Sequence, residues 1–210
     1  MSLLLLSDTH ADEIRTCLGN WLASIGDNPS VGYLASSADP TREYFQPIVE
    51  LYDSLGAQIT AFAEPIHGPD CELYDPLFAC DIIHLCGGNT FEYLHHLGAS
   101  GLDARLKAFV AAGGHLVGVS AGAVLMTPDI ASATYCGDEP VVPFQVTEGL
   151  GLVTFGVIPH VQDKAALAAR LQTNEVPLTT ALYLMADTDA IEFRDGQLHT
   201  TGTPTLIAPE

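Results

Sequence analysis

The sequence around Ser120 has the residue types and the spacing of a serine nucleophile. Gly118 and Gly122 flank Ser120 at two residues on either side, which is the G-x-S-x-G pattern of a sharp turn from a strand into a helix. Small neighbours let the helix pack on the strand while the turn holds the serine in a strained conformation. We therefore predict that the Ser120 hydroxyl attacks a carbonyl group, with a helix N-terminus beneath it. The alternative is a glycine-rich turn with an incidental serine.

A serine hydroxyl is a weak nucleophile at neutral pH, so it needs a base that is itself oriented by a third group. Of the eight histidines, His160 is the candidate base, because it follows a short apolar run and can face the same crevice as Ser120. The alternative is a surface histidine. The orienting carboxylate is expected in the long connection 127–154, which holds four acids, and physical argument leaves the adjacent Asp138 and Glu139 open.

Two backbone segments offer N–H groups for a tetrahedral intermediate. Ala121, the residue after the nucleophile, supplies one donor. Gly87-Gly88-Asn89 follows a buried strand and offers the second, since glycine lets the backbone come close to a ligand; the alternative is an ordinary strand-to-helix turn. His95 and His96 have no second cluster at metal-ligand spacing, so we expect no metal and no cofactor.

The elements that must position these residues are short apolar strands that alternate with amphipathic helices. Strands are expected at residues 3–6, 31–35, 58–62, 81–85, 115–119, 155–159, 181–186, 190–193 and 197–200. Helices are expected at residues 12–24, 41–55, 91–97, 102–112 and 163–171, with a loop and a short helix over 65–78. This alternation predicts an α/β fold, a doubly wound and mostly parallel sheet, in one domain spanning residues 1–210. Ligands bind such sheets beyond the carboxyl ends of the strands, where both glycine-rich turns fall.

Composition excludes several classes of function. The net charge is −19 with only seven lysines and arginines, which argues against nucleic-acid binding and means that an acidic substrate would need a local cation. No apolar run reaches the length of a membrane span, and residues 1–6 are expected to form a core strand rather than a signal peptide. Five cysteines without a C-x-x-C pair favour a reduced, cytoplasmic location.

Three segments resemble the peptidase E family, the α-aspartyl dipeptidases, whose relatives include cyanophycinase. They are C-G-G-N-T-F at 86–91, G-V-S-A-G-A at 118–123 and P-H at 159–160, and the L-L-L-L-S at 3–7 is also similar to the start of the family. The resemblance implies a three-layer fold of the class I glutamine amidotransferase type. It implies a serine hydrolase acting on peptides, with Ser120 as nucleophile, His160 as base, and Gly88 with Ala121 as the oxyanion hole.

The triad acid and the substrate contacts are also implied by the resemblance. The family carries its acid in an N-D-x-P segment after the nucleophile helix, which matches Asp138-Glu139-Pro140, so Asp138 is the expected acid and Glu139 the alternative. The family's basic G-E-T-R segment after the histidine is missing here. Lys164 and Arg170 are the nearest cations in sequence and, with Asn89, the candidate substrate contacts, although lysine lacks the bidentate fork of arginine.

These observations predict a serine exopeptidase that releases the N-terminal residue of a short peptide, with N-terminal Asp as one candidate, through a Ser-His-Asp/Glu triad and an acyl-enzyme. A short peptide is the expected partner, neither nucleic acid nor membrane is expected, and a homodimer is left open. Two other functions remain open. One is an esterase of the α/β-hydrolase type, which shares the order of triad residues but has a later histidine. The other is a non-catalytic binding module on the same scaffold.

Overall fold

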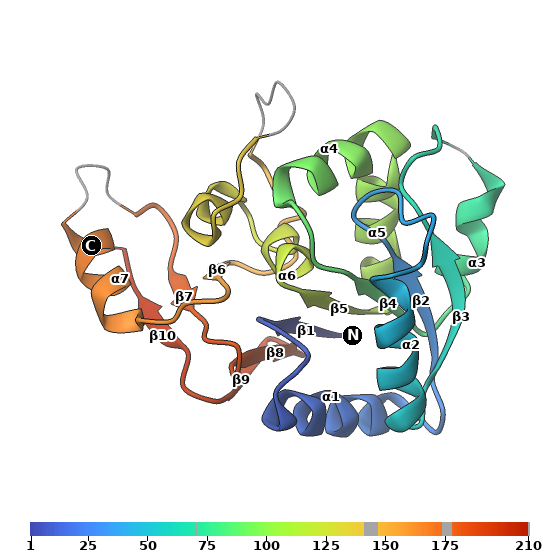
Figure 1. Cartoon of the computed structure of the whole chain (residues 1–210), viewed down its shortest axis with the longest axis horizontal. Coiled ribbons are helices and arrows are strands. Elements are labelled where there is room, and N and C mark those ends of the chain that lie inside the picture. Colours follow the sequence, from blue (N-terminus) through green and yellow to red (C-terminus); the bar gives the residue numbers. More distant parts are fainter. Residues whose placement is uncertain (70, 141–146, 174–177, 210) are drawn as a thin grey trace.

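A seven-stranded sheet forms the centre of the structure, a computed structural model that describes residues 1–69, 71–140, 147–173 and 178–209 (Figure 1). Its strands are β1 (Ser2–Leu6), β2 (Ser30–Leu34), β3 (Gln58–Ala63), β4 (Ile82–Leu85), β5 (His115–Val119), β8 (Ala190–Arg194) and β9 (Gln197–Thr201). The strand order is β3-β2-β4-β5-β1-β8-β9. The pairs from β3 to β1 are parallel, whereas β8 and β9 run antiparallel to their neighbours.

Helices cover both faces of this sheet, as Figure 1 shows. The helices are α1 (Asp12–Ile25), α2 (Phe45–Ser54), α3 (Asp75–Phe78), α4 (Thr90–Ser100), α5 (Leu102–Ala111) and α6 (Ala121–Leu125). Alternation along β1 divides them, because Leu4 and Leu6 pack with α1 and α2 while Leu3 and Leu5 pack with α3 to α6. All four leucines are fully buried, which is typical of a parallel strand covered on both faces. The predicted mostly parallel sheet between two helical layers is therefore confirmed.

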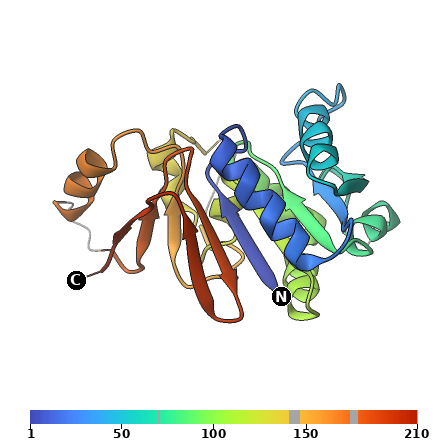
Figure 2. The same ribbon diagram turned by 90° about the horizontal axis from the view of Figure 1, so that it is seen from below.

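A second, three-stranded sheet lies beside the first and carries the C-terminal part of the chain. It consists of β6 (Gly156–Ile158), β7 (Leu182–Leu184) and β10 (Thr205–Ile207), in the order β10-β7-β6, and α7 (Lys164–Gln172) packs on it. Figure 2 shows the β8–β9 hairpin next to β1, on the side of the large sheet nearest to these strands. The sequence predicted β6 and β7 but not their separate sheet, and it predicted no strand after residue 201.

Several element boundaries differ from the sequence prediction for local reasons. The helix expected from residue 41 begins at Phe45, because Arg42 has a φ of 60° that a right-handed helix does not allow. The break expected over 98–101 is confined to Gly101, whose φ of 68° ends α4 and precedes α5. The stretch 65–78 holds the 3-10 helix η1 (Glu72–Tyr74) and α3, and the long connection holds η2 (Ala131–Cys136), with 141–146 outside the described residues.

Two further properties bear on the expected compartment and partners. All five cysteines are free thiols. In the part of the chain that the structure describes, no helix has both the length and the apolar character needed to cross a bilayer.

Candidate active site

Ser120 lies at the turn between β5 and α6, at the carboxyl end of the parallel strands. Its φ of 52° and ψ of −112° belong to a region that residues with a side chain rarely adopt. The Ser120 N–H donates a hydrogen bond to the Leu6 carbonyl at 2.9 Å, which ties the turn to β1. A Cβ atom at Gly118 would overlap the Gly122 carbonyl, and one at Gly122 would overlap the carbonyl of Leu85. Close packing of α6 on β5 and β4 therefore requires both glycines of the G-x-S-x-G pattern.

His160 reaches Ser120 from the smaller sheet. It follows β6, has a φ of 59°, and its N–H donates to the Ser7 hydroxyl at 2.8 Å. Ser7 is completely buried at the end of β1, so this bond joins the two sheets beside the nucleophile. His160 Nε2 lies 2.8 Å from Ser120 Oγ, which is hydrogen-bond distance for a base and its nucleophile. A binding module would not need this contact.

The carboxylate on the other side of the imidazole belongs to Asp187, a residue that the sequence analysis did not select. Asp187 Oδ1 lies 2.7 Å from His160 Nδ1. The reason is the register of the smaller sheet, in which Ile158 of β6 lies opposite Leu184 of the parallel strand β7. Residues just after these two strands reach the same edge, so an acid following the predicted strand 181–186 was the available signal.

Asp138, the expected triad acid, lies elsewhere. Its Oδ2 accepts hydrogen bonds from the N–H of Thr90 at 2.8 Å and from the Thr90 hydroxyl at 2.6 Å. These contacts satisfy polar groups at the start of α4, where backbone N–H groups have no partner within the helix. The expected contact of this carboxylate with His160 is therefore absent from the described structure, and the carboxylate found there is that of Asp187.

Glu139 and Asn89 also contribute to this helix start. The Glu139 residue is exposed, and its backbone carbonyl accepts a hydrogen bond from Asn89 Nδ2 at 2.9 Å. Asn89 Oδ1 accepts from the N–H of Glu92 at 3.0 Å and so caps α4. Both polar ends of the Asn89 amide thus take part in structural hydrogen bonds, although Asn89 also lines the cavity described below.

The two cations predicted to contact substrate do not reach Ser120. Lys164 Nζ donates to Asp189 Oδ2 at 2.7 Å and to the Thr203 carbonyl at 2.6 Å. Because the Asp189 side chain is 1% exposed, this is a buried ion pair that holds α7 to the residue before β8, and the bond to Thr203 holds α7 to the loop after β9. Arg170 is exposed near the end of α7 and lies outside the cavity lining.

The segments expected to form an oxyanion hole lie next to each other. A Cβ atom at Gly87 would lie 3.6 Å from the Ser120 Cβ, so the turn after β4 packs against the nucleophile. Gly88 has a φ of 143°, and a Cβ there would overlap the Ser36 hydroxyl. Ala121 is the first residue of α6, whose first N–H groups have no partner within the helix. Because the N–H groups of Gly122 and Ala123 already donate to the Cys86 and Ser120 carbonyls, and α6 has only five residues, the Ala121 N–H rather than a long helix dipole would carry the stabilisation.

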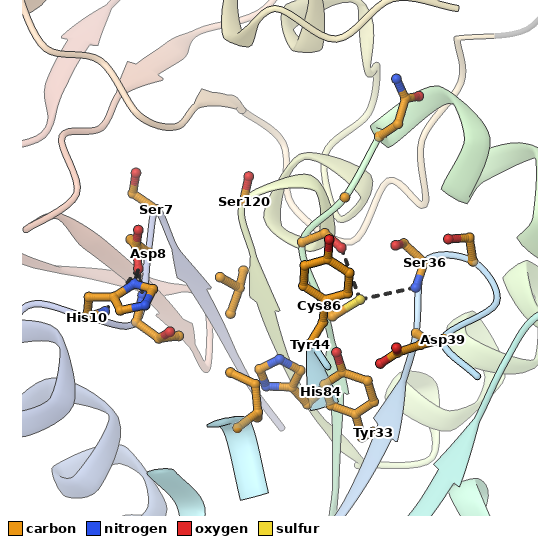
Figure 3. A pocket seen from close by; sticks show the side chains of 18 of the residues that line it. Ser7, Asp8, His10, Tyr33, Ser36, Asp39, Tyr44, His84, Cys86 and Ser120 are labelled. Carbon is orange, nitrogen blue, oxygen red and sulfur yellow. Dashed lines mark hydrogen bonds and ion pairs between the residues drawn. The ribbon is translucent and has the colours of Figure 1, made fainter. Parts of the chain in front are cut away.

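A cavity of about 520 Å³ opens beside Ser120, at the carboxyl ends of β1, β2, β4 and β5 (Figure 3). Its volume falls within the range usual for small-molecule sites. In Figure 3, Ser7, Asp8 and His10 lie on one side of Ser120, and Ser36 and Asp39 lie on the other. None of the seven lysines and arginines is among the described residues that line the cavity.

Asp8 adds a second carboxylate near His160. Partial burial raises the pKa of Asp8, but hydrogen bonds from His10 and from the Thr9 N–H outweigh this effect and leave the pKa below its ordinary value. Asp8, His160 and Asp187 are also the one group among the described residues whose ligand atoms lie close enough to hold a metal, all within 4.8 Å. Two of the three already pair with each other in the hydrogen-bond chain to Ser120, which gives them a role without a metal.

Buried groups form the floor of the cavity. His84 is 1% exposed, and burial lowers its pKa to about 3, so its imidazole stays neutral and hydrogen-bonds Tyr52 Oη at 2.9 Å. Burial also raises the pKa of the Cys86 thiol. A thiol that holds its proton is a poor nucleophile, which leaves Ser120 as the nucleophile that the geometry supports.

Sequence comparison places the chain among peptidases. The model of peptidase family S51 matches residues 3–201. An uncharacterized peptidase of Listeria monocytogenes is 38% identical over 81 residues, which are 38% of this chain and 40% of that protein. Peptidase E of Citrobacter koseri is 27% identical over 158 residues, 72% of this chain and 68% of that protein. The match to the Listeria protein thus spans about four tenths of that relative's length.

Solved structures show the same fold. A crystal structure of a putative peptidase E protein from Listeria monocytogenes superposes with a TM-score of 0.77 at 22% identity, covering 95% of this chain and 97% of the other. The crystal structure of a peptidase from an acI-B1 actinobacterium superposes with a TM-score of 0.65 at 20% identity, covering 99% of this chain and 93% of the other. At these identities the likeness concerns the fold.

Proposed function

Because this chain belongs to peptidase family S51, we propose that it is a serine peptidase that hydrolyses short peptides with Ser120 as its nucleophile. The observation that carries the proposal is the chain of two hydrogen bonds from Ser120 Oγ to His160 Nε2, at 2.8 Å, and from His160 Nδ1 to Asp187, at 2.7 Å. Nucleophile, base and orienting acid follow one another in the order that acyl transfer requires.

The reaction proceeds through an acyl-enzyme. His160 Nε2 takes the proton of Ser120 as Oγ forms a bond to the scissile carbonyl carbon, and Asp187 stabilises the imidazolium. The N–H groups of Ala121 and Gly88 donate to the oxyanion. His160 then gives its proton to the leaving amine as the C–N bond breaks. Water, deprotonated by His160, finally attacks the acyl carbon and releases Ser120.

A cavity of about 520 Å³ suits a short peptide segment, and we propose that the residue released is the N-terminal one. Peptidase E proteins are among the relatives, but none of the described residues that line the cavity is a lysine or arginine that would favour an N-terminal aspartate. We retain the class I glutamine amidotransferase type as the finer fold assignment. We also propose that the protein acts in the cytoplasm, which the five free cysteines support.

The deciding experiment compares the parent protein with Ser120→Ala on a panel of dipeptides and on nitrophenyl esters. Loss of the nucleophile should lower kcat/KM by about 10⁴-fold or more while the melting temperature stays unchanged. A phosphonate inhibitor should label Ser120 in the parent protein. Peptide hydrolysis by Ser120→Ala at the parent rate would contradict the mechanism, and turnover of esters without peptides would favour an esterase.

A further inference from the structure

Asp39 stands out in the cavity wall because half of its carboxylate has no partner. The residue is 7% exposed, and its Oδ1 accepts a hydrogen bond from the Glu43 N–H at 3.2 Å. Its Oδ2 is the buried side-chain nitrogen or oxygen that lacks a hydrogen-bond partner among the described residues. Figure 3 shows this carboxylate directed toward Tyr33. A buried carboxylate oxygen without a partner is costly, so the position favours a ligand group that donates to it.

No neighbouring cation of the protein supplies that partner. Arg42 is closest in sequence, but its guanidinium carbon lies 3.3 Å from the centroid of the Phe62 ring and also faces Phe45. The charge next to Asp39 is instead negative, because the Asp39 N–H donates to the Glu64 carboxylate at 2.6 Å. This end of the cavity is therefore anionic and is not neutralised from within the described structure.

An exposed aromatic side chain at the same end suits a cation as well. Tyr44 lines the cavity and is 74% exposed, which leaves ring surface available to a ligand. Tyr33 stands beside Asp39, and burial raises its pKa, to which the Asp39 charge contributes a smaller part. The exposed face of the Tyr44 ring can therefore attract an ammonium or guanidinium group, whereas the buried Tyr33 ring already stacks on Phe62 and His84.

We infer that this end of the cavity binds the positively charged side chain of an N-terminal lysine or arginine, with Asp39 as the specificity-determining residue. The inference rests on the proposed function, which places the scissile carbonyl at Ser120. Gly87 packs on Ser120 and Gly88 on Ser36, three residues before Asp39, so one cavity joins the two positions. The net charge of −19 also favours the approach of cationic peptides.

The first test uses the parent protein and matched substrates. Lys-Leu and Arg-Leu should be cleaved with a kcat/KM at least about tenfold above that of Leu-Leu, because a charge-assisted hydrogen bond forms in a largely desolvated site. Acetylation of the lysine Nζ atom removes the charge and should remove the advantage. Faster cleavage of Asp-Leu, or equal rates for lysine and acetyl-lysine, would overturn the inference.

The second test changes Asp39 alone. Asp39→Asn keeps an oxygen for the Glu43 N–H but removes the charge, so the Lys-Leu to Leu-Leu ratio of kcat/KM should fall about tenfold. Asp53→Asn removes the same charge from an exposed position of α2 and should leave that ratio unchanged. If Asp39→Asn weakened Leu-Leu as much as Lys-Leu, Asp39 would hold the peptide α-ammonium group, and the side-chain subsite would be wrong.

Binding to Ser120→Ala separates this inference from the proposed function. Calorimetry with Lys-Leu and Leu-Leu on that variant should show about tenfold tighter binding of Lys-Leu, which Asp39→Asn in the same background removes. Selective binding of Lys-Leu, without any peptide hydrolysis by the parent, would refute the peptidase and keep the subsite. Hydrolysis by the parent, with equal binding of the two peptides, would keep the peptidase and refute the subsite.

Discussion

At the scale of single residues, the contacts of two aspartates assign them different roles. Asp187 meets the imidazole of His160, whereas Asp138 accepts two hydrogen bonds from Thr90 at the start of α4. An imidazole acts as a base toward Ser120 only if its other nitrogen carries the proton, and a carboxylate at Nδ1 enforces that tautomer. By this argument Asp187 orients the base and Asp138 stabilises a helix.

Matched amide substitutions distinguish these two roles. Asp187→Asn should lower kcat by about 10²–10⁴-fold with little change in KM, because the amide cannot stabilise the imidazolium. Asp138→Asn should retain most of the activity, since an amide oxygen still accepts from Thr90. Steady-state kinetics on one dipeptide, with circular dichroism as a folding control, measures both. Equal losses in the two variants would contradict the assignment of Asp187.

Closeness in sequence to His160 does not make a cation available to the substrate. Lys164 follows His160 by only four residues, but its ammonium group is committed to Asp189 and Thr203. Releasing it toward a ligand would leave a buried, unpaired carboxylate, which costs several kcal/mol. Among the described residues that line the cavity, the charged side chains that remain are the acids Asp8 and Asp39.

At the scale of elements, the strand-to-helix turn depends on close approach of backbones. β5 and α6 meet so tightly that neither Gly118 nor Gly122 has room for a Cβ atom. The bond from the Ser120 N–H to the Leu6 carbonyl adds β1 to this contact. The strained conformation of Ser120 persists because three elements hold it.

Two glycine-to-alanine substitutions test this packing. Gly122→Ala should lower the free energy of unfolding by about 1–3 kcal/mol and reduce activity, because its methyl group meets the Leu85 carbonyl rather than a flexible side chain. Gly98→Ala is the control, since a Cβ there meets nothing within 4 Å in α4, and it should stabilise by about 0.5–1 kcal/mol. Urea unfolding measures both. A fully stable Gly122→Ala protein would refute the packing argument.

At the scale of the whole molecule, the large sheet contains a buried titratable group, His84. His84 of β4 is neutral in the folded protein, because burial lowers its pKa from 6.5 to about 3. Its ring stacks on Tyr33 and hydrogen-bonds Tyr52, so it joins β2, β4 and α2. Protonation of this imidazole would therefore be opposed by the packing of three elements.

This arrangement predicts an acid-sensitive stability. Between pH 6.5 and about 3 the unfolded chain binds a proton at His84 that the folded protein does not bind. The stabilisation that the neutral His84 gives the folded protein is thus complete above pH 6.5 and is lost as the pH falls. The free energy of unfolding should decrease by up to about 1.4 kcal/mol per pH unit. Urea unfolding at pH 7.5, 6.5, 5.5 and 4.5 measures the slope.

Replacement of the imidazole provides the comparison. His84→Gln is neutral and polar at every pH. Below pH 6.5 its free energy of unfolding should therefore depend less steeply on pH than that of the parent, by the slope that binding of about one proton produces. His199→Gln replaces an exposed histidine of β9 and serves as the matched control, so its slope should equal that of the parent. Identical slopes for the parent and His84→Gln would refute the role assigned to His84.

Much of the molecule was predictable from local sequence because local physics controls it. Alternating strands and helices predicted the large sheet, since each strand must bury its apolar side chains between two layers of helices. The spacing Gly118, Ser120 and Gly122 predicted the turn, because only glycine permits that approach of backbones. Placement after an apolar run singled out His160, which the structure brings to Ser120.

Only the tertiary structure decided which distant groups meet. The contact of Asp187 with His160 depends on β6 and β7 pairing in a sheet of their own. The alternation of side chains along a strand does not say which other strand pairs with it. The capture of Lys164 and the unpartnered oxygen of Asp39 likewise depend on loops from distant parts of the chain. The sequence alone thus pointed to Ser120 and His160 as the proposed nucleophile and base, and it determined the layers that hold them. Long-range packing determined which carboxylate meets His160 and which charges line the cavity, because both arise between segments that local propensity does not connect.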